Sequence, residues 1–296
     1  MREAREETRL ASLWLGLAGA AALAAAPGLA QAGTSNLYID RAVLQAADAR
    51  CRLLGPEASA ALAAGAAQAR GAVLRAGRSE REVRAMEAQA KAQANSIACS
   101  APELAEAARQ IEDAYRGFAR ITRMTYPGLQ AAWQADRTET RGHRWRLSQE
   151  AAFGRDRMTF GLAGRDTPGA LLAVARFHDG AQPYGARLVM RDTGRTLGPH
   201  LPGGAKALSS RLPPKTGQRA YLAEARSPAG ADLLPKDARA GWAFRFPAEA
   251  VSVLAGLDPR EAVAVQFLFP GDRVRTAYVE VGDFAAARAF VQMAAR

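Results

Sequence analysis

Apolar residues recur every three or four positions over residues 35–124, which is the spacing of one buried face of an α-helix. Glycine and proline interrupt this pattern at Gly55-Pro56 and again at Gly77. We therefore expect about four helices: one over residues 37–54, one over 57–75, and two more that begin near Ser79 and Ser100.

The last two of these helix starts share a short motif. Ser79 and Ser100 are each followed three residues later by a glutamate, Glu82 and Glu103. This is the spacing of a capping box, in which the serine side chain and the glutamate side chain each bind a backbone N–H of the first turn. We expect both serines to cap their helices.

The pattern changes to alternating apolar and polar residues after about residue 140, and such alternation is typical of half-buried strands. Turns rich in Gly, Pro and Asp separate the strands. Strands are expected over residues 143–149, 157–162, 171–178, 186–191, 219–224, 242–246, 262–269 and 274–281, and helices over 248–254 and 283–293.

These patterns predict an α+β protein in which a helical domain precedes an antiparallel β-sandwich or barrel-like domain with a C-terminal helix. We divide the chain into a signal peptide (1–32), a helical domain (33–128), a linker (129–140) and a β-rich domain (141–296).

The first 32 residues have the layout of a secretory signal: charged residues, then an apolar run, then small residues at Ala30-Gln31-Ala32. A retained membrane anchor is the alternative, because the apolar run is nearly long enough to span a bilayer. The Pro27-Gly28 break and the Ala-x-Ala site favour cleavage. We expect a mature chain that is periplasmic or secreted and has no stable membrane span.

The chain has two cysteines, Cys51 and Cys99. Export to an oxidising compartment favours a disulfide, which would close a loop of about 49 residues and stabilise the fold by about 4 kcal/mol in the chain-entropy model. The alternative is a reactive thiolate, since Cys99 lies just before an expected helix start. The helical part contains no histidine to activate a thiol, so we predict the disulfide.

The net charge is +11, with 40 basic and 29 acidic residues. Only four of the basic residues are lysine, and a bias toward Arg, Ala and Gly is what GC-rich coding produces, so the charge is weak evidence for function. Residues 129–296 hold 24 basic and 16 acidic residues. Export argues against a nucleic-acid partner and leaves anionic envelope polymers as partners of matching charge.

Six arginines lie at or beside expected strand positions in the β-rich half. Aligned on neighbouring strands they would form a stripe whose guanidinium groups bind phosphates or carboxylates. The alternative is that they are solvated side chains spread around the domain. The candidate anion-binding residues are Arg144, Arg146, Arg187, Arg245, Arg273 and Arg275.

No catalytic residue, metal site or cofactor is assigned from the sequence. His178-Asp179 places an imidazole beside a carboxylate at a strand end, where a general base would fit, but Asp179-Gly180 is equally typical of a hairpin turn. The other two histidines, His143 and His200, are far from it in the chain. Scattered histidines and paired cysteines argue against a zinc site.

These observations favour an exported bacterial envelope protein that acts as a non-enzymatic binding module, with an envelope protein or an anionic envelope polymer as its partner. Two alternatives stay open: a periplasmic enzyme whose site is assembled from residues distant in sequence, and an assembly or chaperone-like partner that uses the helical domain.

Overall fold

The computed structural model describes residues 27–165, 168–203, 207–234 and 238–293, without the side chains of residues 27–32. The signal segment expected over residues 1–32 therefore lies outside the residues described in full. The chain separates into two compact units, a helical unit that ends at Ile121 and a β unit that begins at Thr122. None of the described helices has both the length and the apolarity to cross a bilayer.

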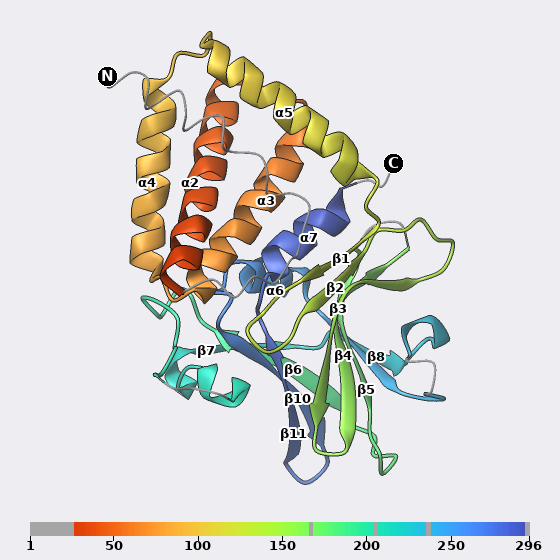
Figure 1. Cartoon of the computed structure of the whole chain (residues 1–296). Helices are drawn as coiled ribbons and strands as arrows, with labels where there is room; N and C mark the ends of the chain where they lie inside the picture. Colours follow the sequence, from red (N-terminus) through yellow and green to blue (C-terminus); the bar gives the residue numbers. More distant parts are fainter. Residues whose placement is uncertain (1–26, 166–167, 204–206, 235–237, 294–296) are drawn as a thin grey trace. The chain divides into compact units, whose positions relative to one another are not determined.

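The helical unit consists of four described helices, drawn in red to yellow in Figure 1. Within this unit α2 packs against both α3 and α4, and α5 packs against α3. The helices are α2 (Pro27–Cys51), α3 (Pro56–Arg75), α4 (Glu80–Ser96) and α5 (Pro102–Ala119).

Alanines form much of the core of the helical unit. Ala47 of α2 and Ala90 and Ala94 of α4 are buried in one cluster with Leu104. Because alanine has no side chain beyond Cβ, the two backbones approach closely here. Little apolar area is buried at each such contact, so the unit depends on additional links between its helices.

A disulfide between Cys51 and Cys99 is one of these links and confirms the predicted pairing. It joins the last residue of α2 to the connection between α4 and α5, with the two Cα atoms 5.5 Å apart. Next to it, Arg50 Nη2 donates to the carbonyl of Ile97. Both contacts hold the C-terminal end of α2 to the C-terminal end of α4.

The two expected serine caps have different outcomes. Ser79 is the N-cap of α4, and the reciprocal bonds of a capping box with Glu82 are both present. The prediction for Ser100 was wrong, because α5 begins at Pro102, its N-cap is Ala101 and no side chain caps it. The fixed φ of proline favours the first position of a helix, which places the helix start beyond Ser100.

The capping box predicts a pH dependence for the helical unit. Hydrogen bonds from the backbone N–H and hydroxyl of Ser79, with the charge of Arg78, lower the pKa of Glu82 from 4.5 to about 2. The ionised Glu82 carboxylate therefore contributes fully to the stability of the helical unit above pH 4.5. This contribution is lost as the pH falls toward 2. In Glu82→Gln we expect the acid loss of helical circular dichroism over this range to be shallower than in the parent chain. Equal titration curves would contradict this.

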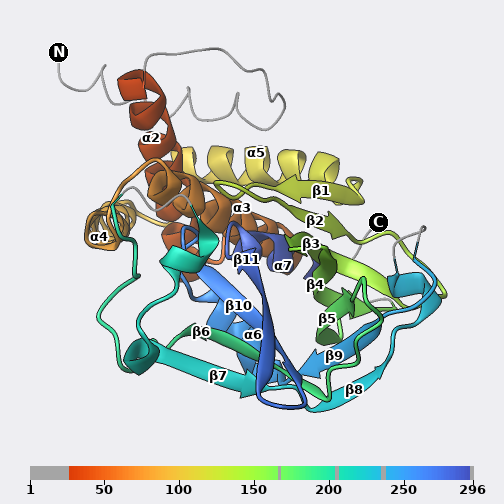
Figure 2. The same ribbon diagram turned by 90° about the horizontal axis from the view of Figure 1, so that it is seen from below.

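The β unit contains two antiparallel sheets. The larger has the order β1-β2-β3-β4-β5-β9-β8 and the smaller the order β11-β10-β6-β7. Figure 2 shows the strands of both sheets from below. The strands are β1 (Arg123–Tyr126), β2 (Trp133–Asp136), β3 (Arg144–Phe153), β4 (Asp156–Gly164), β5 (Ala170–Arg176), β6 (Gly185–Arg191), β7 (Gln218–Leu222), β8 (Ala225–Pro228), β9 (Trp242–Phe246), β10 (Ala262–Phe269) and β11 (Arg273–Glu280).

The predicted α+β class and order of elements are confirmed, and the two sheets are not closed into a barrel. Three short strands were not expected: β1, β2 and β8. The first two occupy parts of the ranges assigned to the helical domain and the linker, so the boundary between the units lies at Ile121–Thr122 and not near residue 128. At four residues each, these strands are too short to show a clear alternation.

Aromatic side chains join the two sheets of the β unit. Phe267 of β10 stacks on Phe153 of β3 and contacts Phe177 and Phe244 edge-on or tilted, with ring centroids 5.2 to 5.6 Å apart. Helix α7 (Phe284–Gln292) contacts β1, β2 and β3, where Phe284 packs edge-on against Trp133. Helix α6 (Ala248–Ala255) lies against β5 and α7.

A buried carboxylate fixes the connection between β1 and β2. Glu280, at the end of β11, is fully buried and accepts hydrogen bonds from the backbone N–H groups of Leu129, Gln130 and Ala131 at 2.7 to 2.9 Å. It also pairs with the buried Arg211 at 3.1 Å. This contact ties residues about 150 positions apart in the chain.

Candidate functional site

The described residues bring His178 together with two carboxylates and one guanidinium. We call Asp156, His178, Asp179 and Arg275 the histidine cluster. Asp156 is the first residue of β4, His178 and Asp179 follow β5, and Arg275 lies in β11 of the other sheet. The cluster therefore connects the two sheets of the β unit.

Local backbone geometry places the two aspartates. A two-residue turn at Gly154 and Arg155 joins β3 to β4, and Gly154 has the positive φ of 64° that such a turn requires. Asp156 follows directly and is buried. After β5 the chain turns at Gly180, whose N–H donates to the carbonyl of Phe177 at 3.1 Å. The Asp-Gly turn suggested by the sequence is therefore present and is part of the cluster.

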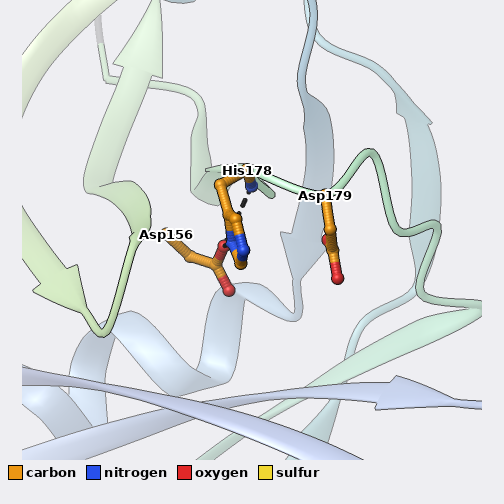
Figure 3. A group of neighbouring side chains, drawn as sticks. All are labelled: Asp156, His178 and Asp179. Atoms are coloured by element: carbon orange, nitrogen blue, oxygen red, sulfur yellow. Dashed lines mark hydrogen bonds and ion pairs between the residues drawn. The ribbon is translucent and has the colours of Figure 1, made fainter.

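Asp156 and His178 make a double contact. Figure 3 shows the carboxylate of Asp156 next to the imidazole ring of His178. Asp156 Oδ1 lies 2.8 Å from His178 Nδ1 and accepts the backbone N–H of His178 at 3.0 Å. An ionised carboxylate only accepts hydrogen bonds, so Nδ1 is the protonated ring nitrogen in this contact. The lone pair of a neutral ring then lies on Nε2, and the His178 side chain is 37% exposed.

Arg275 neutralises much of the negative charge of the cluster. Its Nη1 donates to Asp156 Oδ2 at 3.0 Å and to Asp179 Oδ1 at 3.1 Å, and its Nη2 donates to Asp179 Oδ2. The guanidinium also lies over the rings of Phe177 and Phe269, 5.5 and 5.0 Å from their centroids. Arg275 is thus held by ionic contacts on one side and aromatic contacts on another.

The pKa values of both aspartates are lowered. Burial by itself raises the pKa of Asp156, but the hydrogen bonds from His178 and the hydrogen bond and charge of Arg275 together outweigh it. For Asp179 the largest cause of the lowered pKa is the hydrogen bond from Arg275, followed by the backbone N–H of Ala181. Both groups are therefore ionised at neutral pH.

The effect of Arg275 on the pKa of Asp179 can be measured. In Arg275→Gln we expect the pKa of Asp179 to rise toward its ordinary value, because the hydrogen bond that lowers it most is lost. Carboxyl carbon NMR over an acid titration would record the change. Arg273→Gln is the matched control, since the exposed Arg273 donates to the carbonyl of Pro270 and not to the cluster. The same Asp179 titration in both variants would refute this account of the cluster.

The cluster offers two kinds of chemistry. With Asp156 holding Nδ1–H, the Nε2 atom of His178 is able to take a proton from water or a hydroxyl group. One ligand atom each from Asp156, His178 and Asp179 also lie within 4.8 Å of one another, a spacing that would suit a metal ion. Arg275 already binds both carboxylates, however, so a cation would have to displace its guanidinium. The contacts favour proton transfer over metal binding.

The six arginines expected to bind anions are not brought into one stripe. Arg144 and Arg245 lie on strands of the larger sheet that are separated by β4 and β5, while Arg187, Arg273 and Arg275 lie in the smaller sheet. Arg187 pairs across β6 and β10 with Gln266, whereas Arg275 opposes Phe267, the next residue of β10. Arg187 and Arg275 therefore lie on opposite faces of the smaller sheet.

Several of these arginines already have partners within the chain. Arg144 pairs with Asp136 at 2.8 Å, Arg187 donates to Gln266 at 2.6 Å, and Arg245 lies 3.9 Å from Glu224. Arg245 and Arg273 are the exposed members of the set.

Arg146 is the buried member of the expected anion-binding set. A β-bulge between Trp145 and Leu147 leaves Arg146 without an opposite residue on β4 and breaks the alternation. Its side chain is consequently buried, and Nη1 donates to the carbonyl of Thr138 at 2.6 Å.

Sequence reasoning identified His178-Asp179 but missed Asp156. The sequence alone does not indicate the role of Asp156, because this residue lies 22 positions before His178. Their contact depends on β4 and β5 being neighbours. His143 and His200 do not belong to the group of potential metal ligands found among the described residues.

Comparison of the chain with known protein families, with curated proteins and with solved structures gives no match.

Proposed function

We propose that this chain is an exported bacterial envelope protein, periplasmic or secreted, whose β unit is a binding module for an anionic envelope component. The observation that supports export is the Cys51–Cys99 disulfide, which includes both cysteines of the chain. Disulfides of this structural kind persist in oxidising compartments and are rare in the cytosol.

The charge of the β unit supports an anionic partner. Residues 129–296 hold 24 of the 40 basic residues and 16 of the 29 acidic ones. Buried pairs such as Arg191–Glu261 and Arg211–Glu280 account for some of these charges. Arg245 and Arg273 are exposed on strands of different sheets, and both are available for contact with a polymer.

Co-sedimentation of the full chain with lipopolysaccharide aggregates and with peptidoglycan sacculi tests this proposal. Binding should weaken as salt is raised, because exposed charges are screened over about 8 Å at physiological ionic strength. Binding that is independent of salt, or no binding to either polymer, would count against an anion-binding module.

A second candidate is a hydrolytic enzyme, and the Asp156–His178 contact favours it specifically. His178 Nε2 would take a proton from water as the water oxygen attacks the ester carbonyl, with Asp156 orienting the ring. The protonated ring would then give this proton to the leaving alcohol oxygen as the ester C–O bond breaks, which restores the neutral histidine. A panel of chromogenic esters and phosphate esters tests this. Activity lost in His178→Gln and Asp156→Asn but kept in His143→Gln, which changes an exposed histidine outside the cluster, would favour the enzyme. If the parent chain turned over none of these esters, the hydrolytic enzyme would be ruled out as a candidate.

The third alternative, an assembly partner that uses the helical unit, receives no specific support. Among the large apolar side chains exposed in the described part of the chain, Ile121 is the one that belongs to the helical unit. We do not propose this role.

A further inference from the structure

The two sulfurs of the Cys51–Cys99 disulfide have different surroundings. Cys51 is the last residue of α2, is half-buried, and packs against a cluster of buried residues from α2, α4 and α5. Cys99 lies in the connection between α4 and α5 and is exposed, as are its neighbours Ala98 and Ser100. The bond therefore runs from the core of the helical unit toward its surface.

This difference in surroundings decides which sulfur an external thiol is able to reach. Exchange begins when a thiolate attacks one sulfur of a disulfide in line with the S–S bond, and access to that sulfur limits the rate. An in-line approach to Cys99 Sγ comes from the solvent side. An in-line approach to Cys51 Sγ comes from the side on which Cys51 packs against the core. Attack on Cys99 is therefore the open route.

The charges next to the two cysteines in the sequence favour the other sulfur. Arg50 and Arg52 flank Cys51, whereas the neighbours of Cys99 are uncharged. Positive charge beside a sulfur attracts an anionic thiolate. In an unfolded chain, where burial is lost, we thus expect Cys51 to be attacked at least as readily as Cys99. A preference for Cys99 is consequently a property of the fold.

The surface around Cys99 suits a protein as the source of the thiol. Residues 92–102 contain no charged side chain, and Asn95, Ser96 and residues 98–100 are exposed. A protein that docks here removes no charge of this stretch from water, which is the most costly part of burying a polar surface. The residues on either side of Cys99 are Ala98 and Ser100, and their small side chains leave room for the active-site loop of a partner.

We propose that Cys99 is the sulfur through which the Cys51–Cys99 bond exchanges with a dithiol–disulfide oxidoreductase, a protein with two neighbouring active-site cysteines. A thiolate of the partner bonds to Cys99 Sγ as the S–S bond of the chain breaks, and Cys51 leaves as a thiolate. The second thiolate of the partner then attacks the partner's own sulfur in this mixed disulfide, and Cys99 leaves as a thiolate.

The balance of this exchange fixes its direction. Two electrons pass from the partner, which becomes a disulfide, to the chain, and the protons of the two partner thiols end on Cys51 and Cys99. The reverse sequence, with the partner in its disulfide form, introduces the bond through the same mixed disulfide at Cys99. Exchange at Cys99 does not depend on an anionic partner and so goes beyond the proposed function.

β-Mercaptoethanol, a small neutral thiol, tests which sulfur is attacked. The folded parent chain is incubated with this thiol, quenched in acid to stop Cys51 from attacking the mixed disulfide again, and mapped by peptide mass spectrometry. We expect the thiol on Cys99 in preference to Cys51 by about tenfold or more, because access limits exchange. The same chain in denaturing urea is the control and should lose this preference. A preference for Cys51, or one product ratio in both states, would overturn the assignment.

The rate of the same reaction separates attack on the folded chain from attack after unfolding. Direct attack predicts a rate that rises in proportion to the concentration of the thiol. A rate that levels off at the unfolding rate of the helical unit would show that Cys99 is not reached in the fold, and would contradict the proposal.

Thioredoxin whose second active-site cysteine is replaced by serine tests the protein partner, since it is unable to complete the exchange and stays bonded to the sulfur that it attacks. We expect a covalent complex with the parent chain that is joined through Cys99. A complex joined through Cys51 would overturn the assignment. If β-mercaptoethanol reacts at Cys99 but thioredoxin forms no complex, the site serves small thiols and the oxidoreductase is refuted. The polymer sedimentation described above is independent of these results, so the proposed function is tested separately.

Discussion

Replacing Glu280 with alanine is expected to lower the free energy of unfolding of the β unit by about 3 to 5 kcal/mol, the cost typical of breaking a buried ion pair. The substitution removes the carboxylate that faces Arg211 and accepts the backbone N–H groups of residues 129–131. Because these donors lie in the β1–β2 connection, we expect β1 and β2 to separate from the sheet before the rest of the unit unfolds.

Urea unfolding followed by tryptophan fluorescence measures this change, since Trp133 begins β2 and donates from Nε1 to the carbonyl of Val281 at 2.8 Å. Glu150→Ala is the matched control, an exposed glutamate on β3 whose loss should change stability by less than about 0.5 kcal/mol. If the two substitutions lowered the free energy of unfolding equally, the buried carboxylate of Glu280 would not be what holds β1 and β2 in the larger sheet.

Removal of the disulfide is the second change with a large expected effect. In Cys51→Ala/Cys99→Ala we expect the helical unit to lose about 4 kcal/mol, because the unfolded chain regains the freedom of a loop of about 49 residues. The apolar core of the helical unit is expected to compensate little for this loss of stability, since buried alanines supply much of it.

The effect should be confined to one unit. Amide hydrogen exchange should increase in α2 to α5 and stay unchanged in β3 to β5, because the bond joins residues within the helical unit only. Adding a reductant to the parent chain should reproduce the variant, while the variant itself should not respond. Faster exchange throughout the β unit would instead indicate that the two units unfold together.

The helices and the long strands could be predicted because their signals are local. The capping box at Ser79 acts over three residues, and the alternation of β10 extends over eight. Helix α5 begins at Pro102 and is not capped by Ser100. Here the preference of proline for the first position of a helix overrides the nearby capping-box motif. The cysteine pairing was predicted from the expectation of an oxidising compartment and from the presence of only two cysteines in the sequence.

The candidate sites could not be predicted in the same way, because they depend on which strands are neighbours. Arg275 was expected to bind external anions, but it meets Asp156 and Asp179 because β11 lies across the core from β4 and β5. The bulge that buries Arg146 has no sequence signature in Arg-Trp-Arg-Leu. The contact of Asp156 with His178 requires β4 and β5 to be neighbours in register, which a single sequence does not specify.

The intact mass of the protein recovered from the periplasm, measured with and without reduction and thiol alkylation, tests export most directly. We predict a chain that begins near Gly33 and takes up alkyl groups on Cys51 and Cys99 only after reduction. An uncleaved chain with a free Cys99 that alkylates rapidly would contradict both the compartment and the disulfide.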